Sequence, residues 1–148
     1  SGFAQGEGST GEYGGGTSPT DDDNSGSLTY LQIRYAGYPI TADDELNTIS
    51  LHAVGSGTTI DYIHSHNGAD DGIEFYGGTV NAKHLVVTGA DDDSIDWTNG
   101  YVGNIQYAIV VWNGANQGNT DQGIEADSNS SNNDALAISI PVKSIINC

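Results

Sequence analysis

The stretch Ala69–Asn99, ADDGIEFYGGTVNAKHLVVTGADDDSIDWTN, contains one short phrase twice and decides the fold. Residues 70–75 read DDGIEF and residues 92–97 read DDSIDW. Both copies place an acidic pair and a small residue before an isoleucine, a carboxylate and an aromatic ring, and Ile73 and Ile95 lie 22 residues apart. A fixed period of this length indicates a solenoid, in which each repeat stacks on the next.

Strand-like segments recur at a similar spacing on both sides of this stretch. Residues 28–33, 60–65, 82–87 and 105–111 are rich in branched and aromatic residues, which favours β-strands. A short strand follows each turn, and residues 136–140 and 142–146 form the expected final strands. No segment of a dozen residues has helical periodicity. The sequence therefore predicts an all-β parallel β-helix of about five short rounds, with almost no helix.

Stacking in register predicts which side chains become neighbours. Like positions in successive rounds lie about 4.8 Å apart. The expected interior columns are Ile73–Ile95–Ile124 and Phe75–Trp97, and Ile95 and Ile124 lie 29 residues apart. Alternation along the strand then points three carboxylates outward, those of Glu74, Asp96 and Glu125. A β-sandwich also has short strands at regular spacing, but it gives no reason for an acidic phrase that repeats in register.

The two ends of the chain differ from this repeating part. Residues 1–27 are rich in Gly, Ser, Thr and Asp, with only Phe3 and Tyr13 as large apolar side chains. We expect a Gly-rich arm or loop over residues 1–27, lying on the body or forming a flexible tail, and a β-helix domain over residues 28–148. The start at Ser1 suggests a processed or excised chain. Cys148 is the only cysteine, so no disulfide can form within the chain.

Composition limits the partners of the protein. The 148 residues carry 20 acidic and 3 basic side chains, for a net charge of −17. Phosphate contacts need Lys and Arg, so nucleic acid and anionic membrane surfaces are unfavourable partners. No run of about 18 apolar residues is present, so we expect no membrane insertion. A cation is the natural counterpart, and the Asn-, Gly-, Ser- and Thr-rich composition suggests an extracellular or cell-surface location.

Two segments carry a resemblance to a known family, ADDGIEFYGGTVNAKHLV (residues 69–86) and GADDDSIDWTNG (residues 89–100). Through them the chain resembles right-handed parallel β-helix domains of secreted and cell-surface bacterial proteins, the broad pectate-lyase-like class. The resemblance covers roughly residues 28–127 and implies a right-handed solenoid. Lyases on this fold pair a calcium-binding carboxylate cluster with a basic residue that removes a proton. In this sequence Lys83 or Arg34 would have to supply that base.

The repeated carboxylates are the first candidate site. Stacked carboxylates repel by about 1 kcal/mol per neighbouring pair in water and by about 3–4 kcal/mol at an effective dielectric of 20. Ca²⁺, which takes six to eight oxygen ligands, would relieve this repulsion. The candidate ligands are Asp70, Asp71, Glu74, Asp92, Asp93, Asp96 and Glu125. The alternative is a solvated acidic face screened by salt, since the spacing matches no EF-hand or nonapeptide calcium loop.

Histidines and tyrosines give weaker signals. The four histidines, which could bind a transition metal or stack at turns, are His52, His64, His66 and His84. Tyr30, Tyr62 and Tyr107 occupy nearly one repeat position. Such rings either stack on one another at a corner or form an exposed surface for sugar rings.

Three functions follow as hypotheses. The leading one is a non-enzymatic extracellular structural protein that assembles end to end into a filament or surface layer, because no capping helix is evident at either end of the solenoid. The alternative is a carbohydrate-binding or adhesive surface module that takes a polysaccharide. A calcium-dependent polysaccharide lyase is the third, and the acidic charge of the chain disfavours an anionic substrate.

Overall fold

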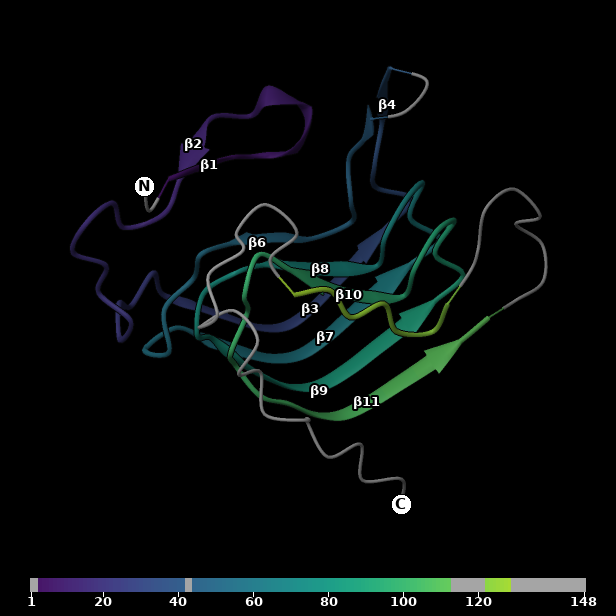
Figure 1. The fold of residues 1–148 in the computed structure, drawn as a ribbon. Helices are drawn as coiled ribbons and strands as arrows, with labels where there is room; N and C mark the ends of the chain where they lie inside the picture. The colour runs from purple at the N-terminus through teal and green to yellow at the C-terminus, as the bar shows by residue number, and fades with distance from the viewer. Residues whose placement is uncertain (1–2, 42–43, 113–121, 129–148) are drawn as a thin grey trace.

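The computed structural model describes residues 3–41, 44–112 and 122–128, and these residues form a stack of parallel coils (Figure 1). One sheet consists of long strands in the order β11-β9-β7-β3, and the other consists of short strands in the order β10-β8-β6. The long strands are β3 (Ser27–Arg34), β7 (Thr59–His66), β9 (Asn81–Thr88) and β11 (Ile105–Val111). The short strands are β6 (Ser50–His52), β8 (Ile73–Tyr76) and β10 (Ile95–Thr98).

The register of the short strands confirms the columns expected from the 22-residue repeat. Ile95 pairs with Ile73 and Trp97 with Phe75 in parallel strands, and an isolated parallel bridge joins Ile95 to Ile124. All pairings within both large sheets are parallel, so the β-sandwich alternative is wrong. In the described residues one 3₁₀ turn is the only helix, and no helix has the length and apolar character needed to cross a membrane.

Each long strand bends at one residue in left-handed backbone conformation. The backbone angle φ is 54–61° at Tyr30, Tyr62 and Tyr107, and it is 49° at His84. The strand pairing skips each of these four residues. A non-glycine residue in this conformation costs about 1 kcal/mol. The backbone hydrogen bonds between neighbouring long strands compensate for this cost, because the residues on both sides of the bend remain paired. The bend gives each coil an angular cross-section.

Two further corners repeat in the same way. Ala53, Gly77 and Asn99 follow the short strands, and Tyr35, Asn67 and Gly89 follow the long ones, all with positive φ. Their amides continue the ladder between coils: Tyr35 N–H donates to the His66 carbonyl at 2.9 Å, and Asn67 N–H to the Thr88 carbonyl at 2.8 Å.

The core lies inside the coils. The largest fully buried side chains in the described residues are Tyr101, Phe75, Ile63, Ile73, Leu85 and Ile95. The Tyr101 ring stacks on Phe75 with centroids 4.6 Å apart, and its hydroxyl donates to the Val80 carbonyl at 2.8 Å. It fills the interior where β10 gives way to the next coil.

The N-terminal residues pack on the first two coils. They contain β1 (Ala4–Gln5), the 3₁₀ turn η1 (Glu7–Ser9) and β2 (Glu12–Tyr13), with β1 and β2 antiparallel. Tyr13 stacks on His52 with centroids 4.7 Å apart, and Ser56 N–H donates to the Asp21 carbonyl at 2.8 Å. A second antiparallel pair, β4 (Pro39–Thr41) and β5 (Asp44–Glu45), projects from the first coil (Figure 1).

The described residues contain four long strands, and hence four coils. The predicted fifth round falls on residues 136–146, which lie outside the described residues, as does Cys148.

Candidate cation-binding site

The acidic residues lie where the turns lead into the short strands. Asp93 N–H donates to Asp71 Oδ1 at 2.9 Å, Asp71 N–H donates to Asn47 Oδ1 at 3.1 Å, and Gln122 N–H donates to Asp93 Oδ1 at 2.8 Å. In each case a side-chain oxygen accepts the amide of the equivalent turn in the next coil. We call Asn47, Asp71 and Asp93 the turn ladder. It holds the turns in register and fixes where their carboxylates lie.

The carboxylates form two overlapping groups. Ligand oxygens of Asp71, Glu74 and Asp96 lie within 4.8 Å of one another, and so do those of Asp70, Asp71 and Asp92. Asp71 belongs to both groups. The structure therefore brings together five of the seven residues in the predicted ligand set. Asp93 lies in the turn ladder, and Glu125 lies close enough to Asp93 to share a hydrogen bond with it.

The site is buried, and in this respect the expectation of a solvated acidic face is wrong. Glu74 is 6% exposed, Asp96 7% and Asp71 9%. Glu74 and Asp96 lie on the face of β8 and β10 opposite the core, as alternation requires. Asn47, itself hydrogen-bonded to Glu7 of the N-terminal segment, covers Glu74. Glu125, in the fourth coil, is only partly buried.

Three residues that are not in the predicted ligand set, Asn47, Glu7 and Tyr76, close this cover. Asn47 Nδ2 donates to Glu74 Oε2 at 2.6 Å, to Glu7 Oε2 at 3.0 Å and to the Tyr76 hydroxyl oxygen at 3.0 Å. The Tyr76 hydroxyl donates to Glu7 Oε2 at 2.8 Å. The sequence reasoning missed these residues. One signal was available for Asn47: because Leu51 pairs with Phe75, the segment Asn47–Leu51 is the first-coil copy of the repeated phrase, with Asn in place of Asp71.

Burial and mutual repulsion raise the pKa values of the central acids. Desolvation, with the nearby Asp70 and Asp96 charges, raises the pKa of Asp71 to about 8. Desolvation and a hydrogen bond with Asp96 raise the pKa of Glu74 to about 9. Desolvation also raises the pKa of Asp96.

The flanking acids are shifted in the same direction. Desolvation, with the Glu7 and Asp92 charges, raises the pKa of Asp70 to about 7. The pKa of Glu125 is raised to about 7, mainly by a hydrogen bond with Asp93. Among the groups that shift the acids of this site, none is a lysine or an arginine.

One oxygen at the centre has no partner in the described structure. Asp96 Oδ1 is buried and makes no hydrogen bond. A buried carboxylate oxygen without a partner is costly, so a hydrogen-bond donor or a cation at this point would be stabilising. The donor set consists entirely of carboxylate and other oxygen ligands, which hard cations such as Ca²⁺ prefer. The residues present therefore fit a divalent hard cation.

The two basic residues considered for a lyase lie in the other sheet. Lys83 belongs to β9, where it pairs with Asp61 and Gln106, and Arg34 lies at the end of β3, opposite His66. Arg34 stacks on the Tyr35 ring, with its guanidinium carbon 5.3 Å from the ring centroid. Neither residue is among the groups that shift the pKa of Glu74 or Asp96.

The histidines do not form one group. His64 pairs with Val86, and His64 and His66 both hydrogen-bond to the Thr88 hydroxyl, at 3.0 and 2.6 Å. His52 stacks beneath Tyr13. His84 Nδ1 lies 2.7 Å from Asp61 Oδ1.

The aromatic residues at the strand bends form a continuous stack, which we call the ring ladder: Tyr30, Tyr62, His84 and Tyr107. Successive centroids are 4.6, 4.3 and 5.0 Å apart, with interplanar angles of 5°, 6° and 19°. The inner ring faces are therefore occupied by neighbouring rings. A sugar could stack only on the outer face of Tyr30 or of Tyr107.

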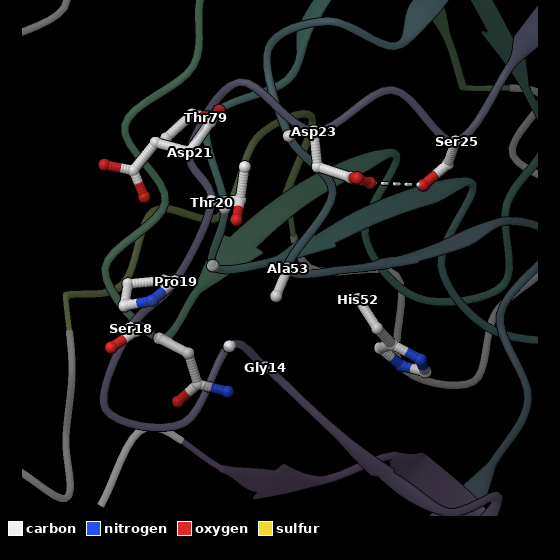
Figure 2. A pocket seen from close by; sticks show the side chains of 15 residues that line it. Gly14, Ser18, Pro19, Thr20, Asp21, Asp23, Ser25, His52, Ala53 and Thr79 are labelled. Atoms are coloured by element: carbon white, nitrogen blue, oxygen red, sulfur yellow. Dashed lines mark hydrogen bonds between the residues drawn. The ribbon is translucent and has the colours of Figure 1, made fainter.

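A cleft of about 520 Å³ opens between the N-terminal segment and the corners that follow the short strands (Figure 2). Asp21, Asp23, His52 and Thr79 line it together with several glycines. In Figure 2 the Asp23 carboxylate accepts a hydrogen bond from the Ser25 hydroxyl, at 3.1 Å. The cleft contains none of the carboxylates of the candidate cation-binding site.

Comparison with known proteins agrees with this architecture. The family model described as "pectate-lyase like beta helix domain" matches residues 1–147. No curated protein and no solved structure gives a significant match. The stacked parallel strands and the family match over nearly the whole sequence lead to one conclusion: the chain belongs to the family of pectate-lyase-like β-helix domains.

Proposed function

We propose that this chain is a non-enzymatic structural module of an extracellular or cell-surface protein, which Ca²⁺ stabilises and which associates end to end with copies of itself. The observation that carries the proposal is the buried group Asp71, Glu74 and Asp96, with ligand oxygens within 4.8 Å and one unpartnered oxygen at Asp96. Calcium in extracellular fluid is abundant enough for modules with dissociation constants of about 10⁻⁴–10⁻³ M.

Burial supports a structural rather than a catalytic use of these acids. A lyase has to bring its polysaccharide against the calcium site, but Asn47 and Glu7 cover Glu74 and leave it 6% exposed. A base is also needed beside the acids, and Lys83 and Arg34 belong to the other sheet. An assay for unsaturated product from polygalacturonate, with and without Ca²⁺, tests this part. Turnover that Lys83→Ala abolishes would overturn it.

Calcium dependence is tested by thermal unfolding of the full chain in chelator and in excess Ca²⁺. We expect the parent to melt at a higher temperature with Ca²⁺ and Asp96→Asn to lose most of that increment. Asp22→Asn, at an exposed acidic position of the N-terminal segment, is the matched control and should keep it. The same increment in the parent and in Asp96→Asn would contradict the assignment.

End-to-end association is supported by the two ends of the long-strand sheet. β3 and β11 are its outermost strands, and each has one strand partner among the described residues. Unpaired strand edges with exposed apolar side chains favour pairing with another chain. Sedimentation velocity over a range of protein concentrations and Ca²⁺ levels tests the association. A strictly monomeric protein under all conditions would contradict it.

Carbohydrate binding is the second candidate, and the observation that favours it is the exposure of Tyr30 and Trp112, 80% and 63%. Ring faces open to solvent can stack on sugars. A glycan array of the parent beside Trp112→Ala tests it, and the absence of any glycan signal would remove it.

A further inference from the structure

The two ends of the ring ladder are both open. Tyr30, at one end, is 80% exposed, and Tyr107, at the other, is 58% exposed. The apolar side chains beside them are exposed too: Leu28 on β3, and Ile109 and Val111 on β11. Among the described residues, β3 has no strand partner on its outer edge, and neither has β11.

These two edges are repeats of one another. Leu28 pairs with Ile60, Ile60 with Ala82, and Ala82 with Ile105, so β3 and β11 carry the same columns. Both strands bend at the ladder residue, with φ of 55° at Tyr30 and 61° at Tyr107. A strand placed on the outer edge of β11 in register would therefore need the shape and pattern that β3 already has.

We infer that the outer edge of β3 receives the outer edge of β11 from a second copy of this chain, in parallel register, with Tyr30 stacked on Tyr107. The inference rests on the proposed end-to-end association and names its interface. The inter-strand spacing of about 4.8 Å in a sheet matches the ring spacings of 4.3–5.0 Å in the ladder. The joint between two copies then repeats the joint between two coils.

Charge sets the conditions for this contact. Each copy carries a net charge of −17, so two copies repel at low ionic strength. Salt or a divalent cation should therefore promote association. The β3 edge offers Arg34 and no carboxylate, and the β11 edge has no acidic residue, so the repulsion comes from elsewhere on the chain.

The register is tested with single-cysteine chains in which Cys148 is replaced by Ser. Thr29 and Gln106 occupy the same column and are both exposed. Thr29→Cys, isotope-labelled, is mixed with unlabelled Gln106→Cys and treated with a short thiol cross-linker. We expect a labelled–unlabelled dimer. Arg34→Cys is the control, because its position is five residues along the strand, roughly 16 Å away, and we expect no product with Gln106→Cys.

Association itself is measured on the same chains by sedimentation. Tyr30→Ala should lose association, whereas Tyr38→Ala, at a tyrosine outside the ladder that is also solvent-exposed, should retain it. Association without the Thr29–Gln106 product overturns this interface and leaves the proposed self-association standing. Residues of the same chain that occupied the β11 edge would give this result, because they would keep the β3 edge of a second copy away from it. No association of the parent in salt or Ca²⁺ overturns both.

Discussion

Replacing Glu74 by Gln removes a buried carboxyl group whose pKa is strongly raised. Desolvation and the hydrogen bond with Asp96 raise the pKa of Glu74 from 4.5 to about 9. A raised acid pKa means that the folded protein keeps a proton that the unfolded chain releases. The stabilising contribution is therefore complete below the unfolded value of 4.5 and is lost as pH rises toward 9.

The expected magnitude follows from this shift. One group changes the free energy of unfolding by about 1.4 kcal/mol per pH unit between its two pKa values. From about pH 5 to about pH 8, in chelator, the parent should therefore lose about 4 kcal/mol more than Glu74→Gln. Such a loss is large beside a total stability of about 5–15 kcal/mol. A bound cation removes the loss, because it takes the place of the proton.

Urea unfolding followed by tryptophan fluorescence gives this free energy at each pH. Glu12→Gln, at an exposed position of β2, is the matched control and should follow the parent. Saturating Ca²⁺, at about 100 times its dissociation constant, should add about 3 kcal/mol to the parent, or roughly 5–10 °C in melting temperature. The Glu74→Gln chain should gain less. Equal pH dependence of parent and variant in chelator would refute the reasoning.

Three further predictions concern the core and the cover of the site, each measured as a free energy of unfolding. Ile73→Ala should cost about 2–5 kcal/mol and exposed Ile40→Ala far less, and equal losses would contradict the assigned core. Tyr101→Phe should cost about 1–3 kcal/mol because the buried Val80 carbonyl loses its donor, and an unchanged midpoint would argue against that bond. Asn47→Ala should destabilise the protein and speed proteolysis within residues 10–20, because Glu7 loses its hydrogen bond with Asn47. Unchanged cleavage would show that Asn47 does not hold the N-terminal segment in place.

The parts of the fold that could be predicted are those that repeat. The pairs Ile73–Ile95 and Phe75–Trp97 follow from the 22-residue period alone, because identical positions in a solenoid become neighbours. The location of His64 beside Val86 follows in the same way. Periodicity also brought the acidic turns together, since the residues of both carboxylate groups occupy repeated positions.

The parts that could not be predicted come from single contacts between the repeating coils and the N-terminal segment. The burial of Glu74 depends on Asn47 and Glu7, and Glu7 meets Tyr76 across 69 residues of sequence. No local pattern reports such a contact. The bends at Tyr62 and His84 were hidden for another reason: a left-handed conformation is unfavourable for both residues locally, and it is sustained by the stack.

The turn ladder also has a consequence for how a molecule of this kind can change length. Each side-chain oxygen in it serves an amide one coil further on, so the bonding partners of a coil are the same whichever coil precedes it. Tandem duplication of one 22-residue unit, such as residues 73–94, would therefore supply a complete new layer together with its own hydrogen-bond donors and acceptors. Evolution can lengthen such a rod by copying a single short segment of its gene, without redesigning either terminus.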